Sequence, residues 1–265
     1  MKKQTLFAVA LCAVAAAVAA EPVNLVPNGD FSQGKKDWQC YGGKVDANKK
    51  TMTLNFHQPL YSKAPIKVDT KANYKMTVKL ASTVPGVMYA GLVSLDKDGK
   101  DIGTAHVSTV FKSDSTLLEP VAAGADTIKV KTAPNWKMHR YPMVAFNTKP
   151  DRSDLPNYDV MGVKAVTAQA DGIEVKLSGK TKKEYPAGTG VRMHTSGATY
   201  IYLINFPKEA VTQSTELVGF IGPKYSARFR TGTDSVKIYF YVAGRKASVT
   251  IEEIKFEKLD APAAK

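Results

Sequence analysis

The chain has 265 residues, and its 37 lysines and arginines outnumber 24 aspartates and glutamates to give a formal net charge of +13. Cys40 is the only cysteine outside the first twenty residues. The fold must therefore depend on its own hydrophobic core rather than on an internal disulfide. The lysines are scattered, which is typical of a solvated surface; the alternative is attraction to an anionic partner such as an acidic polysaccharide. No recognisable nucleic-acid-binding module is present, so we expect no nucleic-acid partner.

The first twenty residues have the pattern of a secretion signal. Two lysines precede an apolar run over residues 6–20, and Val18 and Ala20 precede a predicted cut before Glu21. The run is short for a bilayer span and lacks a charged stop-transfer flank, so we expect no stable membrane insertion; the alternative is an uncleaved anchor. Residues 1–20 are therefore interpreted as a signal peptide. The sequence predicts a protein that is secreted, periplasmic or at the cell surface after cleavage near Ala20.

Alternation of apolar and polar residues dominates the rest of the chain. It is clearest over 74–80, 127–131 and 236–242, where every second residue is apolar. Turn signals such as Asp98-Gly99 separate the alternating segments. No segment has a sustained helical period, so the sequence predicts an all-β protein.

The stretch over 118–197 breaks the even spacing of the strands. It carries its own short strands and a turn-rich loop over 150–159. We interpret it as an inserted β subdomain that forms a small barrel or a meander; the alternative is a set of long excursions from one sandwich. Its flanks, 21–117 and 198–259, then form one discontinuous domain, followed by a tail over 260–265.

Short motifs in the flanks occur in the order known from a family of sugar-binding proteins. Residues 24–38 read N-L-V-P-N-G-D-F-S-Q-G-K-K-D-W. A strand over 74–80 and a D-K-D-G-K hairpin over 96–100 follow, and 236–259 supply a closing pair of strands. These motifs resemble those of the family 4/9 type carbohydrate-binding modules.

The resemblance covers about 24–112 and 198–259 and leaves the insert unmatched. It implies a galactose-binding-like jelly-roll β-sandwich with a glycan cleft on its concave sheet or rim. It also implies a structural calcium between the opening turn and the last strand, to which Asp30 and Glu252 would donate oxygens. Ser32 stands where the family has a ligand Glu, and Glu252 where it has Asp, which weakens the predicted metal site.

A glycan is expected to contact aromatic rings and polar groups outside the closing strands. If the apolar residues of 236–242 face the core, Tyr239 and Tyr241 must point away from it. Arg228 and Arg230 are predicted to point outward from a neighbouring segment and to share that surface. Arginine binds carboxylate or sulfate with two parallel hydrogen bonds, so the mixture suits an anionic glycan. The alternative is an ordinary outer face of polar and aromatic residues.

Two tryptophans are further candidate ligand-binding residues. Trp38 either contacts sugar or packs near the core, as its family counterpart often does. Trp136, with the basic and aromatic residues of 139–141, marks either a second contact surface or the packing of a hinge.

The strand over 199–206 is predicted to belong to the core. Strict alternation sends Tyr200 and Tyr202 to the same side as Ile204 and Phe206, and the last two are apolar.

No catalytic signature is present. The four histidines are isolated, there is no Gly-x-Ser-x-Gly elbow, and the aspartates of 150–159 belong to a polar loop. The sequence therefore predicts an exported, non-catalytic protein that binds a polysaccharide or cell-surface glycan. Two alternatives stay open: an adhesive or structural envelope protein with a protein partner on the insert, and a polysaccharide-active enzyme.

Overall fold

The computed structural model describes residues 22–84, 88–205 and 209–259. In these ranges the chain forms strands β1 to β17 and one short helix, α1 (Thr104–Val107), so the predicted all-β class is confirmed. The predicted signal peptide and tail lie outside the described residues. Among those that are described, no helix is both long and apolar enough to cross a membrane.

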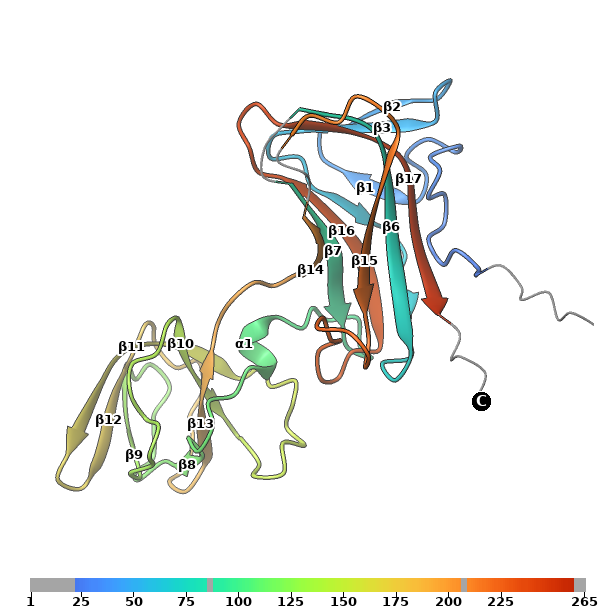
Figure 1. The fold of residues 1–265 in the computed structure, drawn as a ribbon. Coiled ribbons are helices and arrows are strands. Elements are labelled where there is room, and N and C mark those ends of the chain that lie inside the picture. The colour runs from blue at the N-terminus through green and yellow to red at the C-terminus, as the bar shows by residue number, and fades with distance from the viewer. Residues whose placement is uncertain (1–21, 85–87, 206–208, 260–265) are drawn as a thin grey trace, which may run out of the picture.

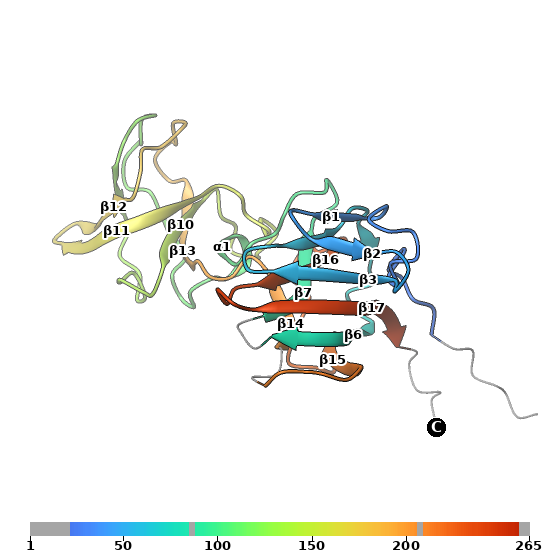
Figure 2. The ribbon, with the colours of Figure 1, turned by 90° about the horizontal axis from the view of Figure 1, so that it is seen from above.

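Two antiparallel sheets pack face to face and form a sandwich (Figures 1 and 2). The front sheet has the order β1-β4-β16-β7-β14, with β5 also paired to β16. Its strands are β1 (Trp38–Cys40), β4 (Leu60–Ser62), β5 (Ile66–Lys67), β7 (Met88–Leu95), β14 (Ile201–Asn205) and β16 (Ser235–Val242). The back sheet has the order β15-β6-β17-β3-β2. Its strands are β2 (Lys44–Asp46), β3 (Thr51–Asn55), β6 (Asn73–Val84), β15 (Thr215–Ile221) and β17 (Ser248–Leu259).

The two ends of the described chain are interleaved within the sandwich. Strand β16 lies between β4 and β7, and β17 lies between β3 and β6 (Figure 2). A further bridge joins Asn24 to Glu257. Segments before and after the central part of the chain therefore share one hydrophobic core.

The alternating segments supply that core. The side chains of Tyr74, Met76, Val78 and Leu80 on β6 point inward and are at most 2 % exposed. The apolar residues of β16 meet them from the front sheet, and all belong to one cluster of buried side chains. Burial of this apolar surface is the main stabilising contribution to the sandwich.

The central part of the chain forms a third sheet, which we call the central sheet. Its order is β8-β13-β10-β11-β12-β9. Its strands are β8 (Ser115–Thr116), β9 (Thr127–Val130), β10 (Pro142–Phe146), β11 (Val160–Gln169), β12 (Gly172–Leu177) and β13 (Gly190–Thr195). Two hydrogen bonds join its ends, from Leu118 N to Lys129 O and from Lys131 N to Thr116 O, both at 3.0 Å. The sheet thus closes on itself.

The central sheet lies beside one end of the sandwich (Figure 1). One contact between them is made by Tyr158, from the turn-rich loop, whose hydroxyl donates to Asp96 Oδ2 at 2.7 Å. The Lys100 ammonium lies 3.5 Å from the centre of the same ring. The backbone N–H of Asn157 donates to the carbonyl of His106 at 2.8 Å. The polar loop over 150–159 therefore fastens the central sheet to the sandwich.

Candidate functional site

Six tyrosines gather on the side of the front sheet that faces away from the core. We call this surface the tyrosine face. Ring centroids of neighbouring members lie between 3.7 and 6.5 Å apart. The members are Tyr61 on β4, Tyr89 on β7, Tyr200 just before β14, Tyr202 in β14, and Tyr239 and Tyr241 on β16.

Strand register places part of this surface in one row across five strands. Gln39 on β1 lies opposite Tyr61, which lies opposite Tyr239. Tyr239 lies opposite Gly91, and Gly91 lies opposite Tyr202. Residues that face each other in an antiparallel sheet have side chains on the same side, so the row forms one continuous surface.

The row is closely packed around Tyr239. The Tyr200 ring stacks on Tyr239 with a centroid distance of 3.7 Å and an interplanar angle of 10°. The hydroxyls of Tyr61 and Tyr200 lie 3.1 Å apart. Gly91 has no side chain, and the backbone of β14 at Ile201 and Tyr202 lies directly against it. Because its neighbours pack over it, Tyr239 is only 3 % exposed. It lies at the base of the tyrosine face, and the neighbouring rings contact solvent.

The prediction that Tyr200 and Tyr202 face the core is wrong. A β-bulge lies between Tyr202 and Ile204 in the pairing of β14 with β7. An extra residue, Leu203, reverses the alternation, so Ile204 is buried in the core whereas Tyr202 is 40 % exposed on the tyrosine face. Phe206, the fourth residue of that prediction, lies outside the described residues.

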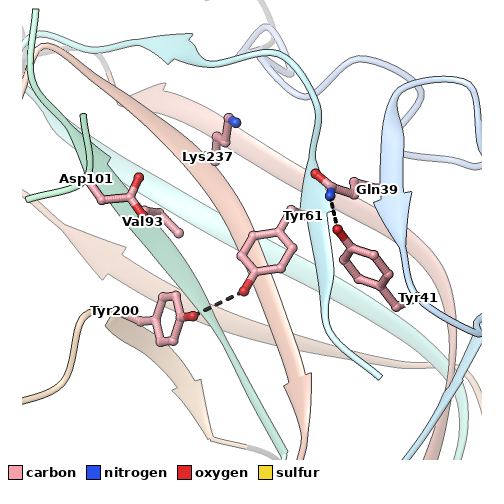
Figure 3. Close-up of a pocket in the computed structure, with 7 residues that line it drawn as sticks. All are labelled: Gln39, Tyr41, Tyr61, Val93, Asp101, Tyr200 and Lys237. Carbon is pink, nitrogen blue, oxygen red and sulfur yellow. Dashed lines mark hydrogen bonds between the residues drawn. The ribbon is translucent and has the colours of Figure 1, made fainter. Parts of the chain in front are cut away.

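A pocket of about 320 Å³ opens at one end of the tyrosine face (Figure 3). Figure 3 shows the Tyr61 ring between Tyr200 and Tyr41, with Asp101 on the side of Tyr200. The lining residues are Gln39, Tyr41, Tyr61, Val93, Asp101, Tyr200 and Lys237. Most of these carry a polar group, so the pocket combines aromatic walls with hydrogen-bonding groups, as small-molecule sites commonly do.

The pocket holds two charged groups, Asp101 and Lys237. Neither the Asp101 carboxylate nor the Lys237 ammonium has an ion-pair partner within 4.0 Å among the described residues. Burial, strengthened by the hydrogen bond to Tyr200, raises the pKa of the Tyr61 phenol above its ordinary value. Burial also raises the pKa of Tyr239. These phenols therefore stay neutral, and a neutral phenol can both donate and accept a hydrogen bond.

The far end of the tyrosine face is capped by a histidine. His57 Nδ1 lies 2.7 Å from the Tyr241 hydroxyl, and the two ring centroids are 6.0 Å apart. Tyr239 and Tyr241 both point away from the core, as predicted, although only Tyr241 is more than marginally exposed.

The predicted arginines do not join the tyrosines on this surface. Residues 227–230 form no strand. Arg228 donates to the carbonyls of Gly222 and Tyr225 in its own loop. Arg230 donates to backbone carbonyls of the segments that connect the sandwich to the central sheet. Both guanidinium groups are thus occupied by carbonyls, which removes the reason for expecting an anionic glycan.

Neither tryptophan lies on the tyrosine face. Trp38 is 2 % exposed, its Nε1–H donates to Asn28 O at 2.9 Å, and its ring lies 5.5 Å from that of Phe31. Trp136 is 6 % exposed and donates to Ser113 O at 2.7 Å inside the core of the central sheet. Both rings are buried by packing, so the expectation that they contact a ligand is corrected.

The predicted calcium ligands have different partners. The Asp30 carboxylate accepts hydrogen bonds from the backbone and hydroxyl of Ser32 at 3.2 and 2.8 Å. Glu252 lies 3.0 Å from the Lys79 ammonium and 2.8 Å from the Ser214 hydroxyl. Nowhere in the described ranges do three or more His, Cys, Asp or Glu side chains gather as a metal site would need. An ammonium on one of two carboxylates does not suit a calcium ion, and the pair does not fit one.

Sequence reasoning missed Gln39, Tyr41, Tyr61, Tyr89, Asp101 and Lys237. The alternation of β16 indicated that Lys237 faces the same side as Tyr239, and this signal could have added it to the site. The others come from distant segments, so only strand pairing brings them together.

The chain matches no protein-family model and no curated protein. Among solved structures it is similar to the enzymatically active domain of tailspike protein 4 of bacteriophage CBA120, at 8 % identity and a TM-score of 0.35. That match covers 89 % of this chain but only 21 % of the tailspike chain. It is also similar to a carbohydrate-binding module, CBM4, at 10 % identity and a TM-score of 0.24, over 86 % of this chain and 99 % of the other.

A third similar structure is a mutant of the Emp46p carbohydrate recognition domain. The identity is 12 % and the TM-score 0.27, over 89 % of this chain and 94 % of the other. Similarities this weak leave the family of the chain unassigned.

Proposed function

We propose that this protein is an exported, non-catalytic carbohydrate-binding protein whose site is the tyrosine face and its pocket. The observation that supports the proposal is the meeting of aromatic rings with two charged groups, Asp101 and Lys237, at one hollow of the front sheet. The rings can cover the C–H faces of a sugar, while the polar groups bind its hydroxyls. Aromatic residues give a large contact area and polar groups give orientation, which together suit a polysaccharide or cell-surface glycan.

The polar groups favour a neutral sugar over an anionic one. Asp101 accepts hydrogen bonds from hydroxyls, Lys237 donates to them, and Gln39 does both. A uronic acid or sulfated sugar would gain from Lys237 but would also approach the Asp101 carboxylate. Opposite charges of equal number give no net preference for an anion, so a neutral glycan is the expected class.

A panel of soluble oligosaccharides tests the proposal. The chain from residue 21 is titrated with cellopentaose, laminaripentaose, mannopentaose and tetragalacturonate, and dissociation constants are measured by calorimetry. We expect binding of at least one neutral member. Tyr41 is 61 % exposed, so Tyr41→Ala should leave stability unchanged and weaken that binding by roughly tenfold, the upper end of what one aromatic contact contributes.

The matched control is Tyr225→Ala. Tyr225 stacks on Phe220 of the back sheet, away from the tyrosine face, and its replacement should leave the affinity as it is. Asp101→Asn should weaken neutral sugars and strengthen tetragalacturonate. Equal affinities for the wild type and Tyr41→Ala would contradict the placement of the site, and no binding across the panel would contradict the proposed function.

The second candidate function is adhesion to a protein through the central sheet. Its loops expose Phe111, Met138 and Tyr141 to 74 %, 48 % and 59 %. Exposed apolar side chains of this size favour a contact surface. This function predicts that Phe111→Ser abolishes attachment to the cell surface while Tyr41→Ala does not, in a binding assay with labelled protein and whole cells.

A further inference from the structure

Two connecting segments form one wall of the pocket. The outgoing segment passes from Asp101 to Thr104 toward the central sheet, and the incoming segment passes from Ala198 to Tyr200 on its way back. Asp101 and Tyr200 both line the pocket. The position of two ligand-facing groups therefore depends on how these segments are held.

Arg230 holds both segments at once. Its guanidinium donates to the carbonyls of Thr199 at 2.6 Å and Ala198 at 2.7 Å in the incoming segment. In the outgoing segment it donates to the carbonyl of Ile102 and to the Thr104 hydroxyl, the latter at 3.1 Å. The Thr104 hydroxyl in turn donates to the Ala198 carbonyl, which ties the segments directly to each other.

We infer that Arg230 is the positioning residue of the pocket, acting through Asp101 and Tyr200; this inference rests on the proposed function of the tyrosine face. Arg230 does not line the pocket and so touches no ligand there. Its contribution is to fix the two segments whose ends carry the ligand-facing groups. Both segments that connect the insert to the sandwich are hydrogen-bonded to the same guanidinium. The insert and the pocket are therefore structurally coupled.

Only arginine has the chemistry for this role. The planar guanidinium offers five donors in a fixed fork, whereas the lysine ammonium offers three donors on a flexible stem. Arg230 has no carboxylate partner among the described residues, so its donors are available to carbonyls and a hydroxyl. Arg230→Lys keeps the positive charge but removes the planar set of donors. It therefore tests whether the hydrogen bonds to both segments, rather than the charge, position the pocket.

Arg228 provides the matched control. It lies two residues away on the same segment and also donates to backbone carbonyls, but those belong to its own loop. Arg228→Lys therefore removes a guanidinium that also donates to backbone carbonyls, but it leaves the hydrogen bonds to both connecting segments in place.

The first test is a double-mutant cycle on oligosaccharide affinity. Arg230→Lys should weaken the best-bound of the four oligosaccharides by roughly tenfold, the usual scale for charged hydrogen bonds, and Arg228→Lys should not weaken it. Because Arg230 acts through Tyr200, combining Arg230→Lys with Tyr200→Ala should cost less than the product of the two single effects. Fully multiplicative effects, or unchanged affinity in Arg230→Lys, would overturn the inference.

The second test needs no ligand and separates this inference from the proposed function. Hydrogen–deuterium exchange is measured on the wild type and both lysine variants. Arg230→Lys should speed exchange over 101–104 and 198–201 by at least threefold relative to Arg228→Lys, with the strands of the sandwich core unchanged. Equal exchange in the two variants overturns the inference even if oligosaccharides bind. Faster exchange over 101–104 and 198–201 supports the role of Arg230 in holding the two connecting segments, even if no oligosaccharide of the panel binds.

Discussion

At the scale of single residues, the most constrained group in the central sheet is the buried side chain of Arg192. Its exposed fraction is 0 %, and its charge is balanced by Asp154 Oδ2 at 2.7 Å and by Asp114 Oδ1 at 3.4 Å. Its Nε donates to His194 Nε2 at 3.2 Å, so that nitrogen carries no proton. His194 Nδ1 then donates to Ala105 O at 2.7 Å, which fixes one neutral tautomer and links β13 to helix α1.

Protonation of His194 should destabilise the protein in mild acid. Burial, together with the positive charge of Arg192, lowers the pKa of His194 from its ordinary 6.5 to about 4. The unfolded chain therefore binds more protons than the folded chain between these values, and the free energy of unfolding falls as pH drops through that range. The loss should approach roughly 3 kcal/mol at pH 4, as measured by urea unfolding across the range.

The matching variant is His194→Gln, whose amide can accept from Arg192 and donate to a carbonyl without titrating. It should reduce the slope between pH 6.5 and 4 without abolishing it, because burial also lowers the pKa of His106. An unchanged slope in His194→Gln would show that another group is responsible.

At the scale of elements, the bulge in β14 decides which side chains the site contains. Leu203 adds one residue to the strand, and this moves Tyr200 and Tyr202 to the outer face while Ile204 stays in the core. A shift of the strand register by one residue moves a side chain from the buried face of a sheet to the face that contacts water. A short structural irregularity therefore creates a third of the tyrosine face.

Deletion of Leu203 should remove this arrangement. Restored alternation would turn either the tyrosines inward or Ile204 outward, and the loss of one buried aliphatic side chain costs roughly 2 kcal/mol. We expect a lower free energy of unfolding and a weaker near-ultraviolet circular dichroism signal from the stacked tyrosines. Leu203→Ala keeps the bulge and should retain that signal; equal spectra for the deletion and the wild type would disprove the role of the bulge.

At the scale of the whole molecule, the sandwich and the central sheet have separate cores. Among the residues that the structure describes, none belongs to both clusters of buried apolar side chains. The contacts between them include polar ones, such as the hydrogen bond from Tyr158 to Asp96. The connecting segments already touch at Thr104 and Ala198, so a short connection could replace the insert there.

Replacement of 106–196 by a short Gly-Ser linker should therefore leave a folded sandwich. Trp136 is removed with the insert, so the fluorescence of the buried Trp38 reports on the sandwich alone. We expect one cooperative thermal transition, within several degrees of the transition that Trp38 reports in the full chain carrying Trp136→Phe. A non-cooperative trace or an unfolded product would show that the sandwich depends on the insert, and would contradict the predicted division into domains.

The sequence by itself determined the all-β class and the inward faces of β6 and β16. These follow from local alternation and from short motifs, which need no knowledge of distant neighbours. The outward direction of Tyr239 and Tyr241 followed from the same periodicity.

The tertiary structure alone decided the composition of the site. Gln39, Tyr61 and Tyr202 come from separate strands, and their meeting depends on pairing register and on a bulge that alternation does not reveal. The prediction for Arg228 and Arg230 was wrong for a related reason. Their charge suggested that they bind a ligand, but their N–H groups donate to backbone carbonyls of nearby segments instead. Alternation records which way a strand faces, but the neighbours of a side chain are set by contacts between segments far apart in the chain.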